Sequence, residues 1–172
     1  MYNEIMQENT QSAITSYIED VQTQYRSGQA KEHAYRPALK TLMSSFENAL
    51  AVNDPKRSQH GNPDFVFLKK SNKGVILGYA EAKDIDISLD KTEKTDQMRR
   101  YAGYDNLFLT NYLDFRFYKN GNKYQTIIIG ELKDGEIKFF SENFSHLESE
   151  LKAFLEQSPE TIKNGKRLAQ IM

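Results

Sequence analysis

The segment from Gly61 to Lys83 constrains the fold of this chain more than any other. A near-continuous apolar run at 64–68 is followed by a charged turn at 69–74 and a longer, mainly apolar run at 75–83. Short apolar runs bounded by turn residues are typical of strands that are covered on both faces. The segment therefore predicts two strands joined by a turn, around which the rest of the chain can be arranged.

Charged side chains stand at the ends of these apolar strands. Asp64 begins the first strand, and Glu81 and Lys83 end the second. Burying an unpaired charge is costly, so core packing does not explain them. If the two strands pair in an antiparallel hairpin, Asp64 and Glu81 meet. Because side chains alternate along a strand, Lys83 lies on the same face as Glu81, about 6–7 Å further along.

Two carboxylates and a lysine suit the hydrolysis of phosphodiester bonds. The reaction needs an activated water, neutralisation of charge on phosphorus and a stabilised leaving oxygen, all of which Mg²⁺ can supply. Because Mg²⁺ is usually held by one or two carboxylates plus the substrate, we expect Asp64, Glu81 and the backbone carbonyl of Ala82 as its ligands. Lys83 would hold the attacking water or the developing charge. Mn²⁺ is expected to substitute for Mg²⁺.

The periodicity of the remaining chain predicts both helices and strands. Apolar residues spaced three and four apart predict helices at 5–26, 31–51, 95–104, 144–155 and 159–171. Apolar runs predict further strands at 107–110, 113–118, 124–129 and 136–140. Residues 84–95 are predicted to be a loop that leads into a helix. This order predicts an α/β (α+β) fold with a mixed sheet flanked by helices.

The bulk composition sets limits on size, compartment and partners. A chain of 172 residues suits one domain with a sizeable core. The absence of cysteine excludes a disulfide framework and a thiolate zinc site. The apolar runs are shorter than a membrane span and the N-terminus does not look like a signal peptide, so we expect a cytoplasmic protein. With 23 basic and 24 acidic residues, DNA binding requires segregated bases or additional domains.

The local sequence also resembles the PD-(D/E)XK nuclease signature. Pro63-Asp64 is followed, after residues 65–80, by Glu81-Ala82-Lys83. The flanking segments are similar to the N-terminal nuclease domain of large bacterial restriction-modification enzymes, and these segments are EHAYRPAL (32–39), GNPDF (61–65), GYAEAKD (78–84), QMRRY (97–101) and LTN (109–111). The resemblance implies a restriction-endonuclease-like sheet and a further acidic group, Glu32, near the metal. It also implies that Gln97 and Tyr101 form a QxxxY element beside the site.

The resemblance further implies a Mg²⁺-dependent endonuclease domain that acts on double-stranded DNA in a restriction-modification or phage-defence enzyme. In such enzymes the nuclease shares one polypeptide with an adenine methyltransferase and a target-recognition domain, sometimes with a helicase-like motor. The whole chain then forms one nuclease domain: an N-terminal helix (1–30), a catalytic core (31–142) and C-terminal helices (143–172) that lead into a longer chain. Cutting both strands with one site needs two copies, which is compatible with transient dimerisation on DNA.

Other interpretations remain open from the sequence alone. The near-neutral charge is compatible with an inactive nuclease-like module that binds DNA or protein, although an intact triad argues against it. A repair or junction-cutting nuclease of the same fold is a third interpretation. Asp64 alone is compatible with a turn after proline, and Glu32 with a helix cap. A cluster of bases is either a DNA contact or a solvated helix face, and its members are Lys91, Lys94, Arg99 and Arg100.

Overall fold

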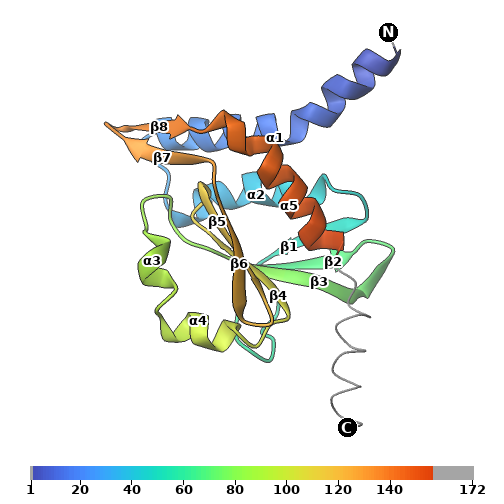
Figure 1. Cartoon of the computed structure of the whole chain (residues 1–172), viewed down its shortest axis with the longest axis vertical. Helices are drawn as coiled ribbons and strands as arrows, with labels where there is room; N and C mark the ends of the chain where they lie inside the picture. Colours follow the sequence, from blue (N-terminus) through green and yellow to red (C-terminus); the bar gives the residue numbers. More distant parts are fainter. Residues whose placement is uncertain (1, 157–172) are drawn as a thin grey trace.

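A six-stranded mixed sheet forms the centre of the computed structural model, which describes residues 2–156, with side chains from residue 13 onward (Figure 1). The strands lie in the order β1 (Ala49–Asn53), β2 (Phe65–Lys69), β3 (Asn72–Ala82), β4 (Asn106–Thr110), β5 (Asp114–Lys119) and β6 (Asn122–Ile128). Neighbouring strands are antiparallel except β3 and β4, which are parallel. The predicted mixed sheet is confirmed.

Helices cover both faces of this sheet (Figure 1). One face carries α1 (Tyr2–Arg26), η1 (Glu32–Tyr35), α2 (Arg36–Ser44) and α5 (Phe144–Glu156), and the other carries α3 (Leu89–Thr92) and α4 (Asp96–Tyr101). A separate hairpin of β7 (Gly130–Lys133) and β8 (Glu136–Phe139) lies beside α1, and η2 (Ser141–Asn143) leads into α5. In the described part of the chain, no helix has the length and apolar character needed to cross a membrane.

The second half of the predicted helix at 31–51 is wrong. The segment starts as the 3-10 helix η1, continues as α2 and ends at Ser44, and residues 49–53 form β1 at the edge of the sheet. Asn48 takes a left-handed backbone conformation with φ of 60°, which reverses the chain into the strand. Leu50, expected on a helical stripe, pairs with Leu68 of β2 instead. Pairing with a neighbouring strand outweighs the local helical pattern here.

Two smaller differences concern segments between the main elements. The predicted loop at 84–95 contains the short helix α3, and strand β7 was not predicted. The hairpin turn at Asn120-Gly121 has positive φ at both residues, which suits the right-handed twist of β5 and β6. The helix predicted at 159–171 lies outside the described residues.

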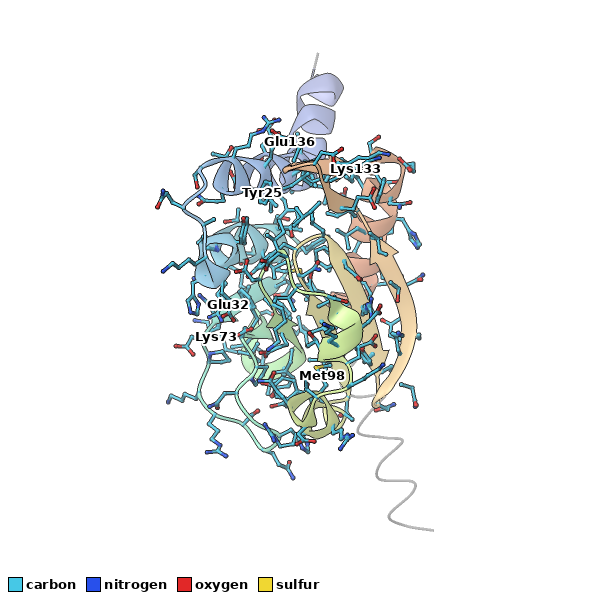
Figure 2. All side chains as sticks on the ribbon, turned by 90° about the vertical axis from the view of Figure 1, so that its left-hand side faces the viewer. Tyr25, Glu32, Lys73, Met98, Lys133 and Glu136 are labelled. Carbon is cyan, nitrogen blue, oxygen red and sulfur yellow. The ribbon has the colours of Figure 1, made fainter. Side chains whose placement is uncertain are left out.

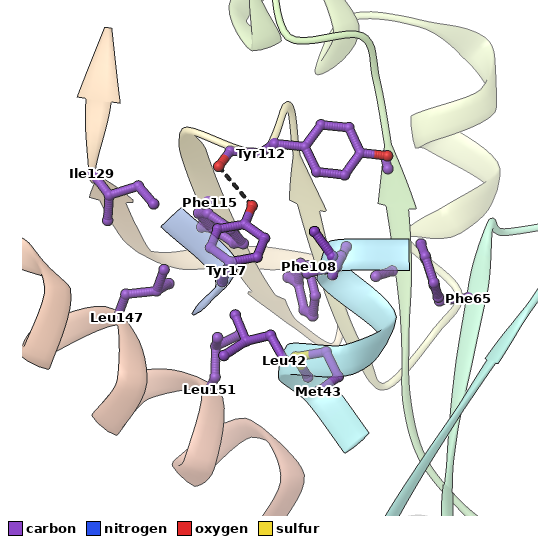
Figure 3. Close-up of a cluster of buried hydrophobic side chains, with 14 of the residues drawn as sticks. Tyr17, Leu42, Met43, Phe65, Phe108, Tyr112, Phe115, Ile129, Leu147 and Leu151 are labelled. Carbon is purple, nitrogen blue, oxygen red and sulfur yellow. Dashed lines mark hydrogen bonds between the residues drawn. The ribbon is translucent and has the colours of Figure 1, made fainter. Parts of the chain in front are cut away.

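The larger hydrophobic core lies between the sheet and helices α1, α2 and α5 (Figure 3). Its centre is aromatic, with fully buried side chains at Phe65, Phe67, Phe108, Phe115, Phe117 and Phe154. The hydroxyl of Tyr17 in α1 donates a hydrogen bond to the backbone oxygen of Tyr112, at 2.7 Å. A smaller cluster under α3 and α4 includes Leu89, Met98, Tyr101, Tyr104, Leu107 and Leu109. The two clusters hold both helical layers against one sheet.

Gly78 in β3 lets α5 approach the sheet closely. A Cβ at Gly78 would lie 2.6 Å from Cζ of Phe154 in α5 and 3.0 Å from Nδ2 of Asn106. Asn106 cannot easily move, because its amide donates hydrogen bonds to the backbone oxygens of Leu77 and Phe154.

We expect Gly78→Ala to lower the free energy of unfolding by about 1–3 kcal/mol, because the added methyl group overpacks this contact. Urea denaturation measures the change. Gly74→Ala in the same strand is the matched control, since a Cβ there meets only Oδ1 of Asn72, at 3.3 Å. Equal losses in both variants would contradict the close-packing explanation.

Candidate active site

The register of β2 and β3 brings two carboxylates together. The strands are antiparallel with Phe65 opposite Ala80, so Asp64 lies opposite Glu81. The backbone N–H of Asp64 donates to Oε2 of Glu81 at 3.3 Å, and the backbone N–H of Ala82 donates to Oδ2 of Asp64 at 2.8 Å. Only 14% of the Asp64 side chain and 5% of the Glu81 side chain are exposed. Both carboxylates are therefore held by backbone groups in a largely dry position.

Lys83 joins these carboxylates to α4. Its Nζ lies 3.5 Å from Oε1 of Glu81 and donates to Oε1 of Gln97 at 3.0 Å. The amide of Gln97 donates in turn to the hydroxyl of Tyr101 at 3.3 Å. Residues 97 and 101 are one helical turn apart and so share a face of α4. The structure thus brings together five of the residues singled out in the sequence.

The electrostatics of the two carboxylates favour a bound cation. Burial, together with the charge of Asp64, raises the pKa of Glu81 to about 7, although Lys83 and hydrogen bonds from Tyr101 and the backbone of Asp64 act against this rise. Burial and the charge of Glu81 also raise the pKa of Tyr101, which keeps its hydroxyl protonated as a donor. A divalent cation would stabilise the ionised form of both carboxylates.

The donor set fits Mg²⁺. This ion takes oxygen ligands and is usually held by one or two carboxylates together with water and substrate oxygens. Asp64 and Glu81 supply two carboxylates at one place, and no nitrogen or sulfur ligand stands beside them in the contacts described above. Among the described side chains, no group of three or more His, Cys, Asp or Glu residues is placed to hold a metal ion. A site built here therefore depends on two carboxylates and on backbone or substrate oxygens.

Arg36, at the start of α2, contacts Asp64 and was missed in the sequence. Its Nη2 donates to Oδ1 of Asp64 at 2.7 Å, and its Nη1 donates to Oδ1 of Asn53 at 3.5 Å. The same Nη2 lies 3.9 Å from Oε1 of Glu32. Glu32 is therefore connected to the carboxylate pair through Arg36. The spacing of four residues between Glu32 and Arg36 is the sequence signal that could have found this arginine.

The four basic residues named as DNA contacts lie on and around α3 and α4. All four are exposed, and they are Lys91, Lys94, Arg99 and Arg100. Arg99 forms an exposed ion pair with Asp96, at 3.2 Å. This side of the molecule also carries Gln97 and Tyr101, and it faces the viewer in Figure 2, where Met98 of α4 is labelled.

A loop preceding Asp64 is attached to the end of α4. The hydroxyl of Ser58 contacts the hydroxyl of Tyr104, and the ring of His60 packs edge-on against the same tyrosine with ring centroids 5.0 Å apart. Gly61 leaves room for Tyr101, since a Cβ at Gly61 would lie 3.0 Å from its ring. These contacts place Asp64 and α4 relative to each other, and no local sequence pattern indicates them.

A buried arginine anchors α3 and the residue that follows it to the sheet. Arg116 lies on β5 opposite Leu109, which in turn neighbours Glu81, so all three share one row across the sheet. Its guanidinium contacts three carboxylates, which belong to Asp90, Glu93 and Asp114. Glu93 also accepts hydrogen bonds from Tyr118 and Lys123. The network positions the segment that presents Gln97.

Glu93→Gln is expected to destabilise the protein by about 1–3 kcal/mol at neutral pH and by less in acid. Burial acts to raise the pKa of Glu93, but hydrogen bonds from Tyr118, Lys123 and Arg116 outweigh burial and hold the pKa below its usual value. A carboxylate of this kind contributes stability above its unfolded pKa of about 4.3, and this contribution is lost as pH falls through the folded pKa.

Urea denaturation midpoints of wild type and Glu93→Gln, measured at a series of pH values between neutral and acid, show whether the stabilities of the two proteins converge as the pH falls. Glu148→Gln on α5 is the control. A stability difference between wild type and Glu93→Gln that does not change with pH would contradict the role of the charge.

Comparison with known proteins identifies the fold. No family model and no curated protein matches the chain. A solved structure, "cryoEM structure DrdV-DNA complex", contains a chain that matches with a TM-score of 0.67 and 18% sequence identity. The match covers 92% of this chain and 15% of that chain, so this protein spans about 15% of the length of its structural relative. The chain therefore shares its fold with one part of a protein whose structure was determined with DNA.

Proposed function

We propose that this chain is a Mg²⁺-dependent DNA endonuclease domain of a bacterial restriction-modification or phage-defence enzyme. The convergence of Asp64, Glu81 and Lys83 at the ends of β2 and β3 carries the proposal. The PD-(D/E)XK resemblance of these residues supports phosphodiester hydrolysis. The structural likeness to a chain of the DrdV-DNA complex supports DNA as the substrate.

Each residue of the site has a distinct part in this proposal. Asp64, Glu81 and the carbonyl of Ala82 would hold Mg²⁺, which when bound supplies Lewis-acid activation of the phosphate and of water. The ammonium of Lys83 orients the attacking water or offsets the charge that develops on the phosphate oxygens. Gln97 keeps this ammonium in place by accepting its hydrogen bond at 3.0 Å. Tyr101 donates to Glu81 and fixes that carboxylate.

Additional domains of the same polypeptide would supply most of the DNA affinity. The net charge of −1 offers little attraction for phosphates. The exposed bases around α3 and α4 would contact the DNA backbone locally and leave sequence choice to a target-recognition domain. Double-strand cutting would come from transient pairing of two copies on DNA.

Plasmid cleavage at low salt with Mg²⁺, Mn²⁺ or EDTA tests the proposal. We expect nicking that needs the metal and that falls below detection in Glu81→Ala, because Asp64 alone cannot hold the ion. Glu131→Ala on β7 is the matched control, since it removes an exposed carboxylate from the separate hairpin.

The full-length chain should be assayed beside the isolated domain, because a net charge of −1 predicts weak DNA binding by the domain alone. DNA binding without metal-dependent cutting in the full-length protein would contradict the nuclease and favour a binding module. Preference for branched over duplex DNA would favour a repair or junction nuclease.

A further inference from the structure

We infer that Arg36 is an internal counter-cation of the carboxylate pair, and that it exchanges Asp64 for Glu32 when a divalent cation binds. The inference rests on the proposed function, because it assumes that Asp64 and Glu81 hold a metal. It assigns Glu32 to the partner of an arginine rather than to the metal itself.

Both carboxylates lie at the same guanidinium nitrogen. Nη2 of Arg36 is 2.7 Å from Oδ1 of Asp64 and 3.9 Å from Oε1 of Glu32. The Arg36 side chain is 10% exposed, so it cannot simply swing into solvent, whereas the side chain of Glu32 is 49% exposed and can adjust. A short movement of the guanidinium would therefore replace one carboxylate partner by the other.

The surroundings of Arg36 do not lock it in one arrangement. Its Nε is buried without a hydrogen-bond partner. Burial raises the pKa of Tyr112, and the charge of Arg36 and a side-chain hydrogen bond with it act against this rise, so the two groups are neighbours. The bond from Nη1 to Asn53 is long, at 3.5 Å. Buried polar atoms normally have partners, so an arrangement that leaves Nε unpaired is compatible with a second position of the side chain.

The charges of the site explain why the exchange accompanies metal binding. When both are ionised, Asp64 and Glu81 carry two negative charges, which Arg36 and Lys83 balance. A divalent cation would add two positive charges next to a guanidinium that occupies Oδ1 of Asp64. Repulsion in this poorly solvated position is strong. Pairing with Glu32 keeps Arg36 neutralised and frees Oδ1 as a ligand.

Calorimetric titration of Mn²⁺ without DNA tests the inference in four proteins: wild type, Arg36→Met, Glu32→Gln and the double variant. Arg36→Met should bind Mn²⁺ about tenfold more tightly, because the competing cation is gone. Glu32→Gln should bind it several-fold more weakly, because Arg36 loses its second partner. In the double variant, the Glu32 substitution should have no further effect, since the two residues act as one unit.

Two results would overturn the inference. Unchanged or weaker Mn²⁺ binding in Arg36→Met would show that the arginine does not compete for Asp64. A loss from Glu32→Gln that persists in the Arg36→Met background would make Glu32 a metal ligand.

If Arg36→Met does not fold, an NMR measurement on the wild type tests the inference instead. The side-chain nitrogen resonances of Arg36, assigned with Arg36→Lys, should shift when Mg²⁺ is added and should stay in place in Asp64→Asn. Unchanged resonances in a wild type that binds Mg²⁺ would overturn the exchange. If the wild type shows no Mn²⁺ binding that depends on Asp64, as tested with Asp64→Asn, both the inference and the proposed metal-dependent function are overturned. If the wild type binds Mn²⁺ through Asp64 but the Arg36 resonances do not change, the inference alone is overturned.

Discussion

Lys83→Ala is expected to reduce metal-dependent cleavage by about 10²–10³-fold while metal binding is retained. The ammonium of Lys83 is the cation of the site that reaches both Glu81 and Gln97, at 3.5 and 3.0 Å. Under the proposed function, its removal takes away the charge that would offset the charge developing on the phosphate. The fold should survive because 26% of this side chain is exposed and Glu81 keeps its bonds to Tyr101 and to the backbone of Asp64.

Initial rates of plasmid nicking and Mn²⁺ calorimetry on the same preparation separate chemistry from metal binding. Lys73→Ala, which removes an exposed lysine near the β2–β3 turn, is the matched control and should cut at the wild-type rate. Full activity of Lys83→Ala would exclude a catalytic role for the lysine. Loss of metal binding together with activity would give Lys83 a structural role instead.

Phe108→Ala is expected to lower the free energy of unfolding by about 3–5 kcal/mol. Phe108 is fully buried in β4 and contacts the rings of four other phenylalanines. The ring centroids are 5.1–6.0 Å away, and the partners are Phe67, Phe115, Phe117 and Phe154. Truncation would leave a cavity where β2, β5 and α5 meet, and these rings cannot all move inward to fill it.

Urea denaturation with wild type, Phe108→Ala and Phe108→Leu measures this contribution. The leucine variant keeps most of the apolar volume and should lose clearly less stability. Ile76→Ala is an exposed-site control, since this side chain is 44% exposed. A loss below about 1 kcal/mol in Phe108→Ala would show that the core can collapse around the missing ring.

Local sequence was sufficient to locate the two central strands and the charged residues at their ends. The apolar run after Asp64 and the run that ends at Glu81 are β2 and β3, and their antiparallel register places these two carboxylates together. The side-chain alternation of a strand also put Lys83 beside Glu81. Gln97 and Tyr101, which lie one helical turn apart, were identified by the family resemblance. In the structure, Gln97 accepts a hydrogen bond from Lys83.

Contacts between segments that are distant in the sequence could not be predicted from local sequence patterns. Strand β1 was predicted as helix because its short apolar run also fits a helical stripe, and only pairing with β2 decides its conformation. The bond from Arg36 to Asp64 joins residues 28 positions apart, and the contact of Ser58 with Tyr104 spans 46.

The sequence by itself determined which residues carry charge at the rims of buried strands, because periodicity and the cost of burying charge act over a few neighbouring residues. Only the tertiary structure decided which groups surround those charges. Arg36 meets Asp64, and Arg116 holds Glu93, through packing of helices on the two faces of one sheet. Such pairings depend on loop closure and on the whole core, so no local pattern specifies them.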